Sequence, residues 1–104
     1  MMHENWQERT VLLAGSANVA RFSKSHVLVA GMGGVGAYAA EQLVRAGIGT
    51  LTIVDGDTIH PSNRNRQLAA LQSTEGLVKT AVMEQRLRDI NPKLQLHVVN
   101  QYIK

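Results

Sequence analysis

The chain has no cysteine, two prolines and four aromatic residues among its 104 residues. Without cysteine, these residues form no disulfide, no thiolate zinc site and no thiol nucleophile. The longest apolar run is far shorter than the roughly 18 residues that a membrane-spanning helix needs. The N-terminus also lacks a basic region followed by an apolar core. With 44% apolar residues and a net charge of +3, the composition predicts one folded domain at most, in the cytoplasm.

Three glycines at the spacing G-x-G-x-x-G follow an apolar run at 27–30 and precede an alanine-rich amphipathic stretch. A strand, a glycine turn and a helix in this order place unpaired N–H groups at a helix N-terminus, which favours an anionic oxygen. An acidic residue, Asp55, ends the next apolar run, 19 positions after Gly36. The pattern predicts nucleotide binding. The alternative is a tight turn without a ligand, in which Asp55 only ends a strand or caps a helix.

Hydrophobic periodicity predicts helices over 5–14, 16–22, 34–46 and 75–90, and strands over 27–30, 51–54 and 94–99. The helix over 34–46 should bury one face formed by Val35, Ala39, Leu43 and Ala46. The helix over 75–90 should bury a face formed by Met83, Leu87 and Ile90. Ser16 is the expected N-cap of its helix. The polar segment at 55–72 is irregular, and loops of this length are often functional.

These elements predict an α/β fold with a Rossmann-like, mostly parallel sheet and helices on both faces. Residues 1–25 would form two extra helices, and residues 26–104 one mononucleotide-binding half of a Rossmann-like sheet. The chain stops at Lys104, where such a half-sheet would need more strands to be covered. We therefore expect a fragment of a larger domain, or a domain that needs a partner.

The polar residues that follow the glycine turn indicate the protein family more specifically than the glycines do. Residues 54–67 read Val-Asp-Gly-Asp-Thr-Ile-His-Pro-Ser-Asn-Arg-Asn-Arg-Gln, and Gly76, Lys79 and Asp-Ile-Asn-Pro at 89–92 follow. This combination resembles the ATP-dependent adenylating domain of ubiquitin-activating-like enzymes, from about residue 9 to residue 103. The resemblance implies that residues 26–104 are the first half of such an ATP-binding adenylating domain. That superfamily includes sulfur-carrier adenylyltransferases of thiamine and molybdopterin synthesis. Segments 62–71 and 82–92 look most similar to its tRNA threonylcarbamoyladenosine dehydratase group.

The resemblance implies roles for particular residues. Asp55 would accept hydrogen bonds from the ribose hydroxyls of ATP, and Asp57 and Gln67 match further family positions. Arg9 would reach the nucleotide of a partner subunit, which requires a homodimer. The glycines of the turn would hold the nucleotide, namely Gly31, Gly33, Gly34 and Gly36. Three polar residues would face the triphosphate, namely Asn63, Arg66 and Lys79.

The implied reaction is adenylation of a carboxylate or related oxygen, with Arg66, Lys79 and Arg9 as its catalytic residues. The acceptor would be a modified tRNA or a ubiquitin-like sulfur-carrier protein. Mg²⁺ is also implied, but its aspartate ligand would lie beyond residue 104, so we assign no metal ligand in this chain. Adenylation needs no side-chain nucleophile, so the absence of cysteine is compatible with it.

Other interpretations remain open. Asp57, His60 and Asn63 could be ordinary turn formers, and Arg9 a solvated helix residue. The glycines with Asp55 also fit an NAD-dependent oxidoreductase, although such a site does not require Arg66 or Lys79. A third possibility is a non-catalytic dimerisation or carrier-binding module that keeps the fold without turnover.

Overall fold

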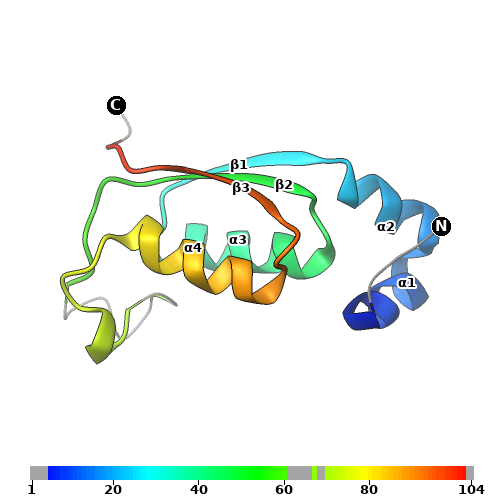
Figure 1. Cartoon of the computed structure of the whole chain (residues 1–104), viewed down its shortest axis with the longest axis horizontal. Helices are drawn as coiled ribbons and strands as arrows, with labels where there is room; N and C mark the ends of the chain where they lie inside the picture. The colour runs from blue at the N-terminus through cyan, green and yellow to red at the C-terminus, as the bar shows by residue number, and fades with distance from the viewer. Residues whose placement is uncertain (1–4, 61–66, 68–69, 103–104) are drawn as a thin grey trace.

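The computed structural model describes residues 5–60, 67 and 70–102 (Figure 1). Its first part is helical, and a layer of strands over helices follows. The elements, in chain order, are η1 (Asn5–Gln7), α1 (Glu8–Ala14), α2 (Ser16–Ser23), β1 (His26–Ala30), α3 (Gly34–Ala46), β2 (Thr50–Val54), η3 (Gln72–Thr74), α4 (Lys79–Ile90) and β3 (Gln95–Val99).

The three strands are parallel and lie in the order β1-β2-β3. Ala30 pairs with Val54, and Val54 pairs with Val99, so the last residues of all three strands are level. The residues that follow the strands therefore meet at one edge of the sheet, which we call the carboxyl edge. The predicted α/β class and parallel sheet are confirmed.

The helices cover the sheet differently from the prediction. We expected helices on both faces, but α3 and α4 lie on the same face (Figure 1). The connections between parallel strands are right-handed, so helices lie on the same face when each new strand is added on the same side of the one before. The strand order β1-β2-β3 is of this kind. Coverage of the second face in a doubly wound fold requires the strand order to reverse.

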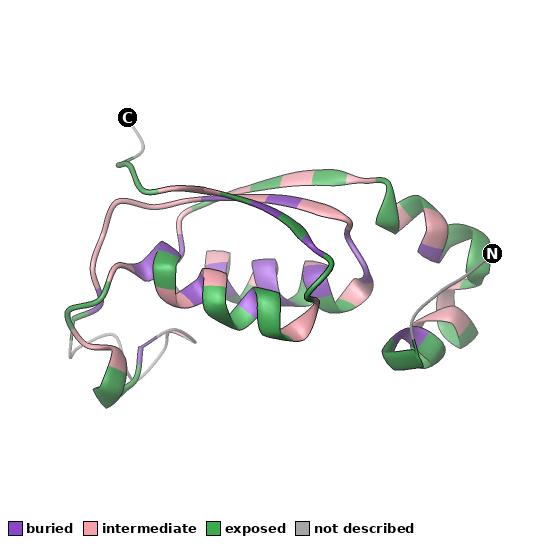
Figure 2. Cartoon of the chain, viewed as in Figure 1, coloured by how far each residue is buried: buried purple, intermediate pink, exposed green. Residues whose placement is uncertain are grey.

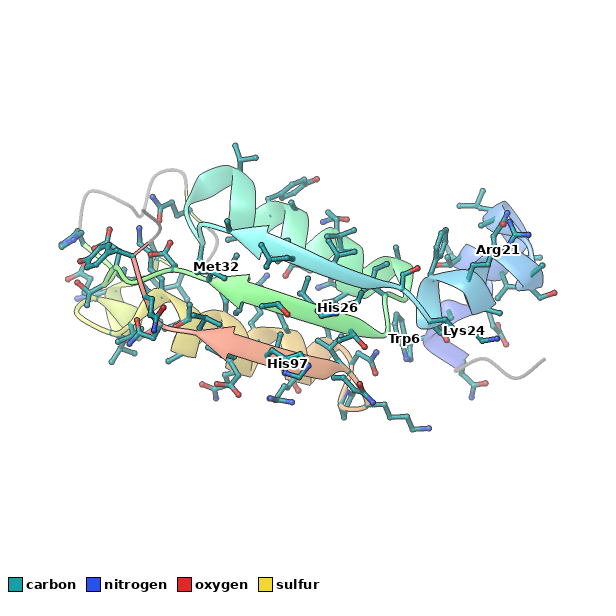
Figure 3. All side chains as sticks on the ribbon, turned by 90° about the horizontal axis from the view of Figure 1, so that it is seen from above. Trp6, Arg21, Lys24, His26, Met32 and His97 are labelled. Atoms are coloured by element: carbon teal, nitrogen blue, oxygen red, sulfur yellow. The ribbon has the colours of Figure 1, made fainter. Side chains whose placement is uncertain are left out.

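The opposite face carries the side chains that point away from these helices. Leu28 is 62% exposed there. His26 and His97 lie on the same face with ring centroids 5.9 Å apart (Figure 3), and His26 Nε2 is 2.8 Å from Thr52 Oγ1. Within the described residues, this face is left uncovered.

The hydrophobic core lies between the sheet and the two helices (Figure 2). Strand β2 contributes Leu51 and Ile53, both fully buried, and α4 contributes Met83 and Leu87 as predicted. Ile90 is partly buried at the margin, also on the predicted face.

The predicted face of α3 was wrong at its first position. Val35 is 85% exposed, whereas the buried stripe is Ala37, Ala40 and Val44. Leu43 packs only at the margin of the core. Alanine at the contact lets the helix approach the sheet closely, so the small residues face inward although valine is the more apolar residue.

Two helix boundaries also differ from expectation. Helix α4 begins at Lys79 rather than at residue 75, because Val78 pairs with Thr58 in an antiparallel bridge and keeps the preceding segment extended. Gly15, rather than Ser16, occupies the N-cap position of α2. The two N-terminal helices themselves form as predicted, with the short helix η1 as the first turn of the predicted helix over 5–14.

Candidate functional site

The glycine turn directly follows β1 at the carboxyl edge. The N–H of Gly31 donates to the carbonyl of Val54 on the neighbouring strand at 2.7 Å, and the φ angle of Gly31 is +92°, in the left-handed region. A Cβ on Gly36 would lie 1.7 Å from the carbonyl oxygen of Gly31. The turn therefore folds back on itself so closely that position 36 has no room for any side chain.

Helix α3 starts inside this turn. Gly33 is its N-cap residue with an extended backbone, and within the described residues no side chain caps the helix and no acidic residue lies in its first turn. The first N–H groups of an α-helix have no partner inside the helix. They carry the positive end of the helix dipole and favour an anion such as a phosphate.

Asp55 ties the glycine turn to the segment after β2. Its Oδ2 accepts a hydrogen bond from the N–H of Met32 at 2.6 Å, and its Oδ1 accepts one from the N–H of Asp57 at 2.8 Å. Each carboxylate oxygen has a second lone pair, so the group can still accept hydrogen bonds from a ligand. Sequence reasoning missed Met32, whose side chain is fully buried and anchors the turn in the core.

Asp57 and Lys79 form an ion pair at the same edge. Lys79 Nζ lies 3.4 Å from Asp57 Oδ2, and the N–H of Lys79 donates to the carbonyl of Asp57 at 3.0 Å. The N–H of Thr58 donates to Asp57 Oδ1 and lowers the pKa of this carboxyl. Partial burial opposes this shift, and the Lys79 ammonium and the His60 ring, 3.4 Å from Asp57 Oδ1, add to it. The structure thus brings both sequence-predicted residues, Asp57 and Lys79, together.

Gln67 reaches the glycine turn from the irregular segment. Its Nε2 lies 3.8 Å from where a Cβ on Gly33 would be. Its Oε1 is buried and accepts no hydrogen bond from the residues that the structure describes. A buried acceptor without a donor is costly, so a ligand that supplies a donor beside the turn would be favoured.

Asn63 and Arg66 lie outside the described residues. Arg9 lies exposed on α1, at the end of the molecule opposite the glycine turn (Figure 1). Where the chain is described, no cluster of three or more His, Cys, Asp or Glu residues could hold a metal ion. No helix in the same residues has the length and apolar character to cross a membrane.

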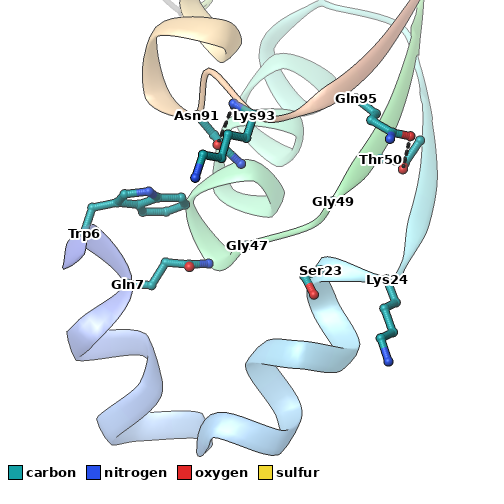
Figure 4. Close-up of a pocket in the computed structure, with 10 residues that line it drawn as sticks. All are labelled: Trp6, Gln7, Ser23, Lys24, Gly47, Gly49, Thr50, Asn91, Lys93 and Gln95. Atoms are coloured by element: carbon teal, nitrogen blue, oxygen red, sulfur yellow. Dashed lines mark hydrogen bonds between the residues drawn. The ribbon is translucent and has the colours of Figure 1, made fainter. Parts of the chain in front are cut away.

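A cavity of about 580 Å³ lies at the opposite, amino edge of the sheet (Figure 4). Its walls come from the N-terminal helices on one side and from the turns before β2 and β3 on the other. Trp6 and Lys93 lie at one side of it and Lys24 at another (Figure 4). The cavity is distant from the glycine turn and contains none of the predicted site residues.

Comparison with known proteins decides the family. The model of the ThiF family matches residues 7–104. The chain belongs to the ThiF family. The tRNA threonylcarbamoyladenosine dehydratase of Escherichia coli is 40% identical over 106 residues, which cover 99% of this chain and 40% of that protein. The predicted resemblance to the dehydratase group is therefore confirmed.

Solved structures of this group match the ThiF-family fold described above. A crystal structure of the E. coli tRNA N6-threonylcarbamoyladenosine dehydratase in complex with ATP aligns with a TM-score of 0.92 and 39% identity, over 100% of this chain and 44% of that chain. The sulfur carrier protein ThiS adenylyltransferase of E. coli is 42% identical over 54 residues, 52% of this chain and 22% of that protein. The chain thus spans less than half the length of these relatives, and none of them is an oxidoreductase.

Proposed function

We propose that the chain supplies the ATP-binding part of an adenylating enzyme, and that the whole enzyme dehydrates threonylcarbamoyladenosine in tRNA. The observation that carries this proposal is the continuous set of contacts from Met32 through Asp55 and Asp57 to Lys79. It joins the glycine turn, the acidic end of β2 and a cation at one edge of the sheet. A bare structural turn would not need the acid or the cation.

The residues fit the chemistry of adenylation. Attack of an oxygen on the α-phosphate develops negative charge on the phosphate oxygens and on the departing pyrophosphate, and fixed cations and N–H groups stabilise that charge. The open N-terminus of α3 and the Lys79 ammonium supply two such groups. Asn63 and Arg66 would supply two more, with Arg66 able to bind two oxygens at once.

The proposed function also includes Mg²⁺, whose ligand would come from residues that the structure does not describe. Among the described residues no ligand cluster for it exists. When bound, the ion would neutralise charge on the triphosphate. Its aspartate ligand would lie after residue 104, as the family resemblance implies.

Arg9 would act only across a dimer. Arg9 belongs to α1, and within one chain α1 lies at the end opposite the glycine turn (Figure 1), so this residue cannot serve the site of its own chain. Leu12 and Leu13 on the same helix are 85% and 90% exposed, which supports burial of α1 against a second copy. The proposed function therefore includes a homodimer. It also includes a tRNA substrate and a location in the cytoplasm.

A second candidate is adenylation of a ubiquitin-like sulfur-carrier protein. It is supported by the identity to the ThiS adenylyltransferase, over about half of the chain. The two candidates share the nucleotide site and differ in the acceptor. They separate in a pyrophosphate-exchange assay of the full-length enzyme with modified tRNA or with a carrier protein.

Calorimetric titration of the chain with ATP, and separately with NAD, tests the nucleotide. We expect ATP to bind and Lys79→Ala to weaken it by roughly tenfold or more, because an ammonium–phosphate contact is charge-assisted. Arg66→Ala should weaken ATP binding in the same way and leave any NAD binding nearly unchanged. A preference for NAD that neither variant alters would refute the adenylating function.

A further inference from the structure

Lys79 is an unusual cation because its side chain is only 7% exposed. A buried charge is costly unless an opposite charge accompanies it. Among the described residues, Asp57 carries the carboxylate that accompanies this ammonium. Lys79 also stands at the first turn of α4, the end of a helix where a positive charge is disfavoured.

Asp57 is held firmly, whereas its contact with the ammonium is loose. The N–H of Asp57 donates to Asp55, and Asp57 Oδ1 accepts from the N–H of Thr58 at 2.9 Å. The distance from Asp57 Oδ2 to Lys79 Nζ is 3.4 Å, longer than the roughly 2.8 Å of a well-made ammonium–carboxylate hydrogen bond. A fixed acceptor and a loosely held donor suit a contact that is made and broken.

We propose that Asp57 is a positioning residue that holds the Lys79 ammonium while the site is empty and releases it to the phosphates when ATP binds. This inference rests on the proposed ATP-binding function and gives Asp57 a role through Lys79 rather than on the nucleotide. When pyrophosphate leaves, the ammonium returns to Asp57. The carboxylate thereby keeps the empty site ordered and competes with the phosphates for one cation.

This role predicts an effect opposite in sign to that of an ordinary ligand residue. Asp57→Asn keeps an oxygen for the N–H of Thr58 but removes the negative charge that accompanies Lys79. The empty chain should therefore be less stable, and the competition with the phosphates is lost. ATP and inorganic tripolyphosphate should bind roughly 3–10-fold more tightly, as expected for removal of one nearby like charge. Adenosine, which has no phosphate, should bind with unchanged affinity.

The experiment is a calorimetric titration of the full chain with ATP, tripolyphosphate and adenosine. The variants are Asp57→Asn, Asp57→Glu, Lys79→Met and the double variant Asp57→Asn/Lys79→Met. Asp57→Glu retains the charge and should restore wild-type affinity for tripolyphosphate within about twofold. In the Lys79→Met background the gain from Asp57→Asn should shrink, because the two residues are energetically coupled.

Glu84→Gln is the matched control. It also removes one negative charge, but Glu84 pairs with Arg88 on the exposed side of α4. We expect less than a twofold change in any of the three affinities.

Two results would overturn the inference separately from the proposed function. Weaker binding of both ATP and adenosine by Asp57→Asn would show that Asp57 contacts or shapes the nucleoside site. An equal change in the presence and absence of Lys79 would show that the two residues are not coupled. If the wild-type chain bound neither ATP nor tripolyphosphate, the proposed function itself would fail, and this inference with it.

Discussion

The N–H of Met32 lies 2.6 Å from Oδ2 of Asp55, and this hydrogen bond joins the glycine turn to the end of the neighbouring strand. Asp55 is thus a structural residue as well as the expected acceptor for ribose hydroxyls. Loss of its carboxylate should affect the shape of the turn before any ligand is present. Stability measurements on the free chain can therefore test part of the site.

Asp55→Ala should lower the free energy of unfolding. It leaves the N–H groups of Met32 and Asp57 without their acceptor, and each such loss costs about 1–3 kcal/mol when the donor stays buried. Urea unfolding followed by circular dichroism would measure the change. Asp89→Ala, on the exposed side of α4, is the control and should change the unfolding midpoint very little. Equal effects of the two substitutions would contradict a structural role of the Asp55 carboxylate in the glycine turn.

Gly36→Ala should be far more damaging than a glycine substitution elsewhere. A Cβ at position 36 would lie 1.7 Å from the carbonyl oxygen of Gly31, so the backbone itself must move. We expect a loss of about 3 kcal/mol or more, or failure to fold. Gly76→Ala provides the comparison, because its φ of +84° is strained for alanine but no atom lies within 4 Å of the new Cβ. That substitution should cost about 1–2 kcal/mol.

Much of this fold was predictable because its signals are local. The glycine turn and Gly47 delimit α3, which runs over the predicted residues 34–46. The strands begin within one residue of their predicted positions, since each is a short apolar run between polar or glycine residues. The grouping of Asp55, Asp57 and Lys79 was implied by the family resemblance, and in the structure a hydrogen bond and an ion pair connect the three residues.

The features that were missed depend on tertiary contacts. The start of α4 is set by the bridge between Thr58 and Val78, residues 20 positions apart, and no local pattern reports it. The inward face of α3 depends on how closely the helix approaches the sheet, which favours Ala37 and Ala40 over Val35. Helices on one face rather than two follow from strand order, which hydrophobic periodicity does not encode.

The rotated face of α3 can be tested directly. Ala37→Leu would insert a larger side chain into a fully buried position and should destabilise the chain by about 1–3 kcal/mol. Val35→Thr changes a residue that is 85% exposed and should stay within about 0.5 kcal/mol of wild type. Thermal unfolding of both variants would show which face of α3 is buried. The face predicted from periodicity would make Val35→Thr the more destabilising of the two substitutions.

Stability at acid pH should depend on Asp57. The pKa of this carboxyl is lowered from its ordinary value of 3.8, first by the N–H of Thr58 and then by Lys79 and by His60, whose Nε2 lies 3.4 Å from Asp57 Oδ1, against the opposing effect of burial. A carboxyl with a lowered folded-state pKa adds stability above its unfolded-state pKa and loses it as the pH falls through the folded-state pKa. Urea unfolding between pH 2 and 7 should show a shallower acid decline in Asp57→Asn than in wild type. A parallel decline in both proteins would contradict the prediction.

The contact between Glu41 and Arg86 should stabilise the packing of α3 against α4. Glu41 is only 6% exposed, and its Oε1 accepts a hydrogen bond from Nε of Arg86. Arg86→Met would leave this carboxylate buried with only the more distant Arg45, at 3.8 Å, and should cost about 2–4 kcal/mol. Glu41→Met/Arg86→Met removes both charges and should recover most of that loss, because a matched apolar pair avoids the desolvation of either charge. Urea unfolding of Glu41→Met, Arg86→Met and the double variant gives the coupling; additive losses would show that the residues act independently.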